Sequence, residues 1–255
     1  MCRVAAVEHS VLELDNVLGE HGQDDQHRRE RRQREQQEPA AMLVILPEFA
    51  QHVVEIRNGM FDSREAAHAF GNSQLRWAFG YAKLAGLALA YLACARFWWT
   101  REHGGRWWSP AGIVWKRLLG GFLLIALVSA STYPLRGHVP DIWLDSVDLA
   151  LLLPVLSLLL YMLSGLFGDA GIPLATILRR SWPWVALLVL LCLAAFGPPQ
   201  ILHGLLHKWA IGQSRALIWM LMTIDALLIG LLASLVGAAL FVAYSAMAKR
   251  LHPSG

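Results

Sequence analysis

Charged residues, cysteines and recognisable catalytic motifs are all scarce in this sequence. Asp, Glu, Lys and Arg make up 16% of its 255 residues, against about 25% in typical soluble domains. Cys2, Cys94 and Cys192 show no CxxC spacing, so they predict neither a disulfide framework nor a zinc site. No P-loop, GxGxxG, GxSxG or HExxH pattern occurs. We therefore predict a protein that is not an enzyme and that uses no cofactor.

What the sequence has in excess is apolar surface. Apolar residues account for 56% of the chain, and the mean hydropathy is +0.42, which indicates a membrane protein. The excess is uneven, because all eleven Trp residues lie between Trp77 and Trp219. A polar, acidic segment 1–75 with eight Lys and Arg against thirteen Asp and Glu precedes this apolar part. The main boundary is therefore predicted near Arg76.

The N-terminal segment 1–75 is predicted to be a polar tail, disordered or partly helical. Its run 19–39 is polar throughout and mixes both signs of charge, so it offers too little apolar surface to drive folding. Because glutamates interrupt its arginines and no aromatic residues lie among them, no nucleic-acid partner is expected. The break in composition also motivates the hypothesis that translation starts at Met60, in which case 1–59 would not belong to the native chain.

The C-terminal segment 76–255 is predicted to be an all-α transmembrane bundle in the lipid bilayer. Apolar runs of this length can cross hydrocarbon only as helices, because backbone polar groups must be satisfied internally. Five runs qualify, or four if the first lies along the membrane surface. The predicted spans are 77–99, 118–135, 149–167, 182–202 and 216–248.

Small residues recur at a spacing of four in two of these runs. Such a stripe lets another helix approach closely, which is how helices associate within lipid. The packing residues predicted in this way are Ala78, Ala82, Gly86, Ala90, Gly230 and Ser234. They motivate an interaction with other membrane subunits or with a second copy of the chain.

Asp225 is the one acidic residue deep inside an apolar run. A carboxylate at that depth is costly unless it is paired, neutral or close to water, so it marks a candidate functional residue. Lys83 and Arg96 in the first run are its candidate partners, and together they form a possible intramembrane proton or ion site. The competing interpretation places Asp225 at the membrane surface, because the run 216–248 is longer than a bilayer requires.

His203 and His207 are weak candidates for metal ligands. Their i, i+4 spacing would place both imidazoles on one face of a helix. They follow Pro198 and Pro199, which are expected to end the fourth span, so the sequence places both histidines in a loop and favours no metal.

The connector 168–182 carries a resemblance to known proteins. A short apolar helix that ends in Leu178-Arg179-Arg180-Ser181-Trp182 before a spanning helix resembles bacterial membrane proteins of the YciC-like and glycerophosphodiester-phosphodiesterase membrane-domain families. The chain departs from their pattern after Trp182, where Pro183-Trp184 replaces the customary Leu-Thr-x-Gly. The resemblance implies a non-enzymatic region of a bacterial cytoplasmic membrane. Arg179 and Arg180 are expected to contact lipid phosphates.

Two functions from different classes remain open at this stage. The first is a structural, assembly or accessory membrane component, which is motivated by the small-residue stripes. The second is a small transporter or channel-like module that uses Asp225 as an intramembrane ion site. Neither orientation is strongly favoured, because the two sides of the five-span arrangement carry eight and six basic residues.

Overall fold

The structure, a computed structural model, describes residues 40–132, 134 and 140–252. Within these residues the regular elements are helices and no strand occurs, which confirms the all-α prediction. The charged run 19–39 lies outside the described residues. Residues from Ala40 onward form one compact unit, and the boundary predicted near Arg76 falls inside it.

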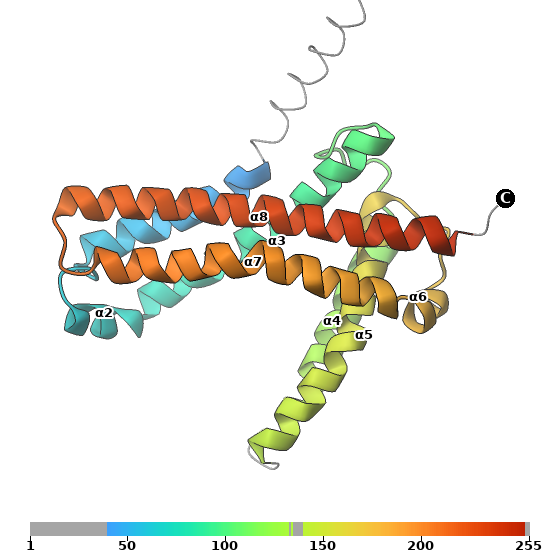
Figure 1. The fold of residues 1–255 in the computed structure, drawn as a ribbon, viewed down its shortest axis with the longest axis horizontal. Coiled ribbons are helices and arrows are strands. Elements are labelled where there is room, and N and C mark those ends of the chain that lie inside the picture. The colour runs from blue at the N-terminus through green and yellow to red at the C-terminus, as the bar shows by residue number, and fades with distance from the viewer. Residues whose placement is uncertain (1–39, 133, 135–139, 253–255) are drawn as a thin grey trace, which may run out of the picture. The chain divides into compact units, whose positions relative to one another are not determined.

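The described chain folds into a helix over residues 40–57 and seven labelled helices (Figure 1). Serine side chains begin two of them: Ser63 Oγ accepts from the backbone N–H of Ala66, and Ser73 Oγ from that of Arg76. The labelled helices are α2 (Arg64–Gly71), α3 (Gln74–His103), α4 (Trp115–Ala130), α5 (Asp141–Phe167), α6 (Leu174–Arg180), α7 (Trp182–Ala210) and α8 (Arg215–Leu251).

Four helices are long and apolar enough to cross a membrane: α3, α5 from Ile142, α7 and α8. The second predicted span, 118–135, does not reach this length. Its helix, α4, ends at Ala130 after 16 residues, or about 24 Å, which is short of a hydrocarbon core of about 30 Å. Pro134 follows soon afterwards, and a proline cannot donate the backbone hydrogen bond that would continue the helix.

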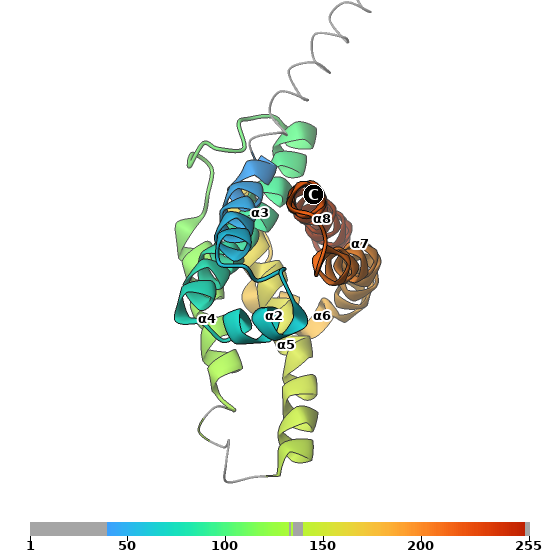
Figure 2. The same ribbon diagram turned by 90° about the vertical axis from the view of Figure 1, so that its left-hand side faces the viewer.

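Helix α8 packs between α7 on one side and α3 with the helix 40–57 on the other (Figure 2). Glycines allow the close approach. A Cβ atom on Gly86 of α3 would lie 2.6 Å from the carbonyl oxygen of Leu43, and one on Gly237 of α8 would lie 2.4 Å from Cys94 Cβ. The helix 40–57 is therefore part of the bundle's packing.

Helices α4 and α5 form a hairpin that projects away from α7 and α8 (Figure 1). Their backbones touch at two glycines. A Cβ atom on Gly121 would lie 2.9 Å from Met162 Cα, and one on Gly165 would lie 2.5 Å from the backbone nitrogen of Leu118.

This contact can be tested with two neighbouring glycines of α4. Replacement of Gly121 by alanine is expected to lower the free energy of unfolding by about 1–3 kcal/mol, because the new methyl group meets backbone atoms that cannot move aside. Gly120→Ala is the matched control, since nothing lies within 4 Å of its added Cβ. It is expected to be neutral or to stabilise the helix by up to about 1 kcal/mol. Equal unfolding transitions of the two variants in detergent would contradict the packing described.

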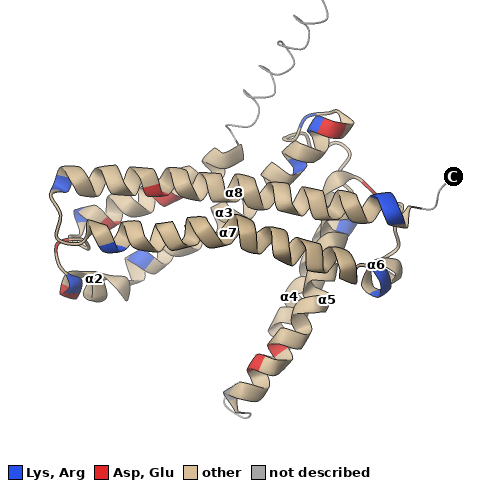
Figure 3. Ribbon diagram, viewed as in Figure 1, with Lys and Arg blue, Asp and Glu red and all other residues tan. Residues whose placement is uncertain are grey.

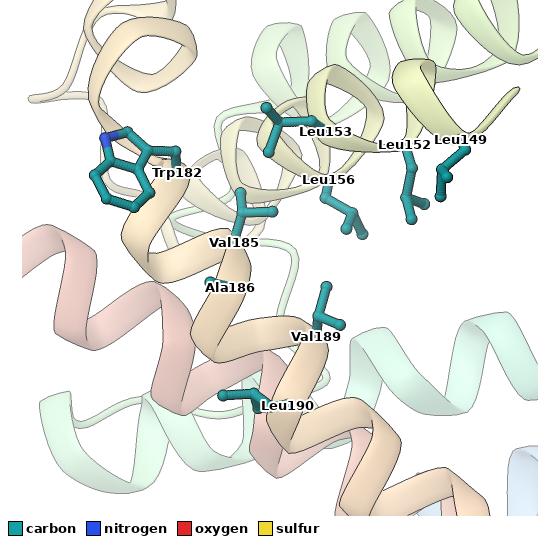
Figure 4. Close-up of a pocket in the computed structure, with 9 residues that line it drawn as sticks. All are labelled: Leu149, Leu152, Leu153, Leu156, Trp182, Val185, Ala186, Val189 and Leu190. Atoms are coloured by element: carbon teal, nitrogen blue, oxygen red, sulfur yellow. The ribbon is translucent and has the colours of Figure 1, made fainter. Parts of the chain in front are cut away.

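An apolar groove of the bundle lies between α5 and α7. The two helices meet where the hydroxyls of Ser157 and Ser181 are hydrogen-bonded at 2.9 Å. A groove of about 650 Å³ lies beside this point (Figure 4). Its lining offers no carboxylate, imidazole or hydroxyl that could hold an ion. The lining residues are Leu149, Leu152, Leu153, Leu156, Trp182, Val185, Ala186, Val189 and Leu190.

Candidate functional site

Lys and Arg lie mostly near helix ends, whereas acidic positions also occur within α8 and the helix 40–57 (Figure 3). Glu48, His52 and Glu55 are spaced i, i+4 and i+7, which places them on one helical face. That face is turned into the bundle, since all three side chains are 0% exposed. Three ionisable residues buried on one face of a short helix need partners on the neighbouring helices.

Asp225 of α8 supplies one of those partners. It is the eleventh residue of α8, which places it about 15 Å along the helix from its N-terminal end. Its carboxylate is 0% exposed and faces three imidazoles: His203 Nδ1 at 2.7 Å, His52 Nε2 at 3.0 Å and His207 Nε2 at 3.2 Å. Because an ionised carboxylate only accepts hydrogen bonds, each of these ring nitrogens is the donor.

The six residues Glu48, His52, Glu55, His203, His207 and Asp225 are called the histidine–carboxylate cluster below. They come from the helix 40–57, α7 and α8. His52 links Asp225 to the two glutamates of its own helix. Its Nε2 lies 3.3 Å from Glu48 Oε1 and its Nδ1 lies 3.1 Å from Glu55 Oε2. The contacts of the cluster are thus continuous from the helix 40–57 through α8 to α7.

Two cations of α3 complete its outer edge. Lys83 Nζ donates to Glu48 Oε1 at 2.9 Å, and Arg76 Nε donates to Glu55 Oε1 at 3.2 Å. Two of the three carboxylates therefore pair with a permanent cation, while the third, that of Asp225, accepts from His52. With protonated His52 as a third positive charge, the sum is zero, which is the condition for burying so many ionisable groups without an unpaired charge.

The pKa values of the groups on the helix 40–57 follow from these contacts. Burial alone would lower the pKa of His52, but hydrogen bonds to Asp225, Glu48 and Glu55 outweigh it and raise the pKa to about 10. Burial would raise the pKa of Glu55, but hydrogen bonds from His52 and Gln51 lower it to about 2. At neutral pH both groups are therefore charged and stabilise each other.

Part of the cluster has the composition of a metal site. One ligand atom from each of His203, His207 and Asp225 lies within 4.8 Å of the others. The side chains of His203 and His207 remain 15% and 20% exposed, whereas that of Asp225 is fully covered. The partly exposed edge of these three residues therefore lies on α7.

The sequence-based prediction for His203 and His207 was wrong in one respect. They lie on α7, which continues through Pro198 and Pro199 to Ala210, and not in a loop. The helix continues because its last turns are packed. Leu206 and Ala210 are buried in one hydrophobic cluster with Phe61, which precedes α2, and with Ile218 and Met222 of α8. The i, i+4 spacing consequently places both imidazoles beside Asp225.

The predicted partners of Asp225 lie elsewhere. Lys83 reaches the cluster only through Glu48. Arg96 lies 13 residues further along α3, about 20 Å away, so the expected pairing of Arg96 with Asp225 was wrong. Its guanidinium instead donates to backbone carbonyls of Trp107, Ser109, Ala111 and Leu166. Arg96 therefore fixes the loop between α3 and α4 against the end of α5.

The remaining predicted residues lie outside the cluster. Arg179 and Arg180 end α6 and are exposed, so their role as lipid contacts stays a prediction. On α3, Ala78 and Ala82 are exposed, whereas Gly86 and Ala90 are buried. On α8, a Cβ atom on Gly230 would lie 2.5 Å from Ile45 Cδ1, and Ser234 Oγ donates to the carbonyl of Gly230.

Sequence reasoning missed the contribution of the helix 40–57. The apolar run Met42–Leu46 is too short to cross a membrane and ends before Pro47, so the sequence places Glu48, His52 and Glu55 in the polar tail. Their i, i+4, i+7 spacing among apolar residues was the available signal.

Comparison with known proteins gives no relative: no family model, no curated protein and no solved structure matches the chain.

Proposed function

We propose that the chain is a cation-handling protein of the bacterial cytoplasmic membrane, a small transporter or channel-like module whose ion site is the histidine–carboxylate cluster. The observation that carries the proposal is Asp225, fully buried on a membrane-capable helix with three imidazoles around its carboxylate. Ionisable residues within such helices are expensive and typically mark ion pathways. The bacterial location rests on the resemblance of the connector 168–182.

Two features support an ion site over a purely structural network. First, the cluster uses six ionisable residues where a well-packed apolar contact would be as stable or more stable, so stability alone gives no reason for it. Second, the exposed edges of His203 and His207 connect the buried Asp225 carboxylate to the surface of the bundle. The two imidazoles therefore lie between the carboxylate and the surface of the bundle.

The proposal predicts that the purified protein carries cations across a vesicle membrane. Vesicles that contain the full chain and a trapped H⁺- or Zn²⁺-reporting dye are expected to show influx above protein-free vesicles when a gradient is applied. Asp225→Asn is expected to reduce this flux to the protein-free level, because it removes the negative charge that holds the cation among the three imidazoles. The control is Asp145→Asn, which removes an exposed carboxylate of α5.

Absence of flux for both ions with the unmodified protein would overturn the proposal, as would full flux with Asp225→Asn.

The second candidate, an assembly or accessory component, rests on Ala78 and Ala82. These two members of the α3 stripe are exposed, and their small size would allow another helix to approach. The buried members of the stripes face the chain itself, since Gly86 contacts Leu43 and Gly230 contacts Ile45. A monomer in mild detergent that captures no partner would remove the support for this candidate.

A further inference from the structure

We propose that the cation held by the histidine–carboxylate cluster is a divalent transition-metal ion of the Zn²⁺ class, bound by His203, His207 and Asp225 with His52 as the fourth ligand. The inference rests on the proposed function for its setting, since it names the ion. It stands on the geometry of the ligand atoms, and metal binding can be measured without transport.

The three ligands on α7 and α8 converge on one point. The i, i+4 spacing sets His203 and His207 one helical turn apart, with Nδ1 of one and Nε2 of the other facing the same carboxylate at 2.7 and 3.2 Å. Tetrahedral Zn²⁺ with bonds of about 2.0–2.2 Å separates its ligand atoms by about 3.3 Å. Small side-chain shifts would therefore admit the ion.

His52 occupies the remaining side of the Asp225 carboxylate. Its Nε2 lies 3.0 Å from Asp225 Oδ2, and its Nδ1 faces Glu55 Oε2 at 3.1 Å. Glu55 is itself held by Gln51 Nε2 at 2.7 Å and by Arg76 Nε at 3.2 Å. A carboxylate that accepts from one ring nitrogen, and so orients the other toward a metal, is the usual support of a metal-binding histidine.

A separate observation also favours a cation in the cluster. The Oε2 atom of Glu48 is buried and has no hydrogen-bond partner among the described residues. A buried carboxylate oxygen without a donor is costly, and this carboxylate lies beside His52 and Asp225 in one of the possible metal-ligand groups. A cation in the cluster would lower that cost.

The donor set selects the class of ion. Imidazole nitrogens suit Zn²⁺ and its first-row neighbours, whereas Ca²⁺ and Mg²⁺ prefer sites built from oxygen atoms alone. His52 gives up its proton when its Nε2 atom binds the ion. The carboxylates of Glu48, Glu55 and Asp225 then exceed the charges of Lys83 and Arg76 by one, which offsets part of the charge of the bound cation.

Metal titration of the full chain in detergent tests the assignment. After chelator treatment, ZnCl₂ alone is expected to bind at one equivalent per chain, as measured by elemental analysis after dialysis. His203→Ala and His207→Ala are expected to lose this equivalent. The matched control is His68→Ala, which replaces an exposed histidine of α2. This variant is expected to retain the bound Zn²⁺. Glu55→Gln is expected to weaken Zn²⁺ binding about 10–100-fold, because it loosens the orientation of His52.

Cobalt provides a measurement that depends on no variant. Co²⁺ in the unmodified protein is expected to give the intense visible absorption of a tetrahedral site. Weak octahedral absorption, or Zn²⁺ binding that His203→Ala leaves unchanged, would overturn the assignment. One equivalent of bound Zn²⁺ without flux would sustain the metal site and overturn transport. Proton flux without Zn²⁺ binding would sustain transport and overturn the metal site.

Discussion

A variant in which Asp225 is replaced by alanine is expected to unfold with a free energy about 3–5 kcal/mol below that of the parent, because it removes one partner from a buried charged network. His52, His203 and His207 lose the carboxylate that accepts their hydrogen bonds. Equilibrium unfolding in detergent, in chelator and without added metal, measures the difference.

Two further variants separate charge from packing. Asp225→Asn keeps an acceptor oxygen for one imidazole, so it is expected to lie between the parent and Asp225→Ala. Asp145→Ala removes an exposed carboxylate and is expected to change the free energy of unfolding by less than about 0.5 kcal/mol. Identical unfolding of Asp225→Ala and Asp145→Ala would show that Asp225 is not enclosed by the three histidines.

The second large effect concerns the hypothesis of a start at Met60. A chain that begins there lacks Glu48, His52 and Glu55, which leaves Lys83 and Arg76 without their carboxylates. It also uncovers Gly86 and Gly230, against which the helix 40–57 packs. We expect this chain to be about 3–6 kcal/mol less stable, because it lacks the buried side chains of Val44 and Ile56, each of which contributes about 1.5–3 kcal/mol.

The matched comparison is a chain that begins at Ala40, which retains the entire described helix. Detergent-solubilised yield and unfolding temperature are expected to be clearly lower for the chain from Met60 than for the chain from Ala40. Equal behaviour of the two would mean that the helix 40–57 contributes nothing to the bundle and that the cluster forms without it.

Hydropathy predicted the bundle well because lipid restricts the chain to one kind of element. The predicted spans 77–99 and 216–248 are long, apolar and uncharged over most of their length. Helices are expected on that ground alone. The predicted span 118–135 was wrong because its apolar length included residues beyond Ala130, where α4 ends. Pro134 limits the length of the helix, and hydropathy does not detect this limit.

The candidate site was only half visible in the sequence for a different reason. Asp225 was identified because a single carboxylate in an apolar run is conspicuous, whereas one of its three partners is distant in sequence. His52 lies 173 residues away, and no local pattern links the two. Pro198 and Pro199 further concealed His203 and His207, because prolines usually end helices and here tertiary packing carries α7 past them.

The distance of 173 residues between His52 and Asp225 also fixes an order of events during synthesis. A chain emerges from its N-terminus, so the face of the helix 40–57 that carries Glu48, His52 and Glu55 exists long before α7 and α8 do. Glu48 and Glu55 find Lys83 and Arg76 once α3 has been made, but His52 lacks Asp225 until α8 follows. Completion of the cluster is therefore coupled to insertion of the last helix, and a ribosome-bound chain that stops before α8 is a nascent form in which the ion site has not yet been assembled.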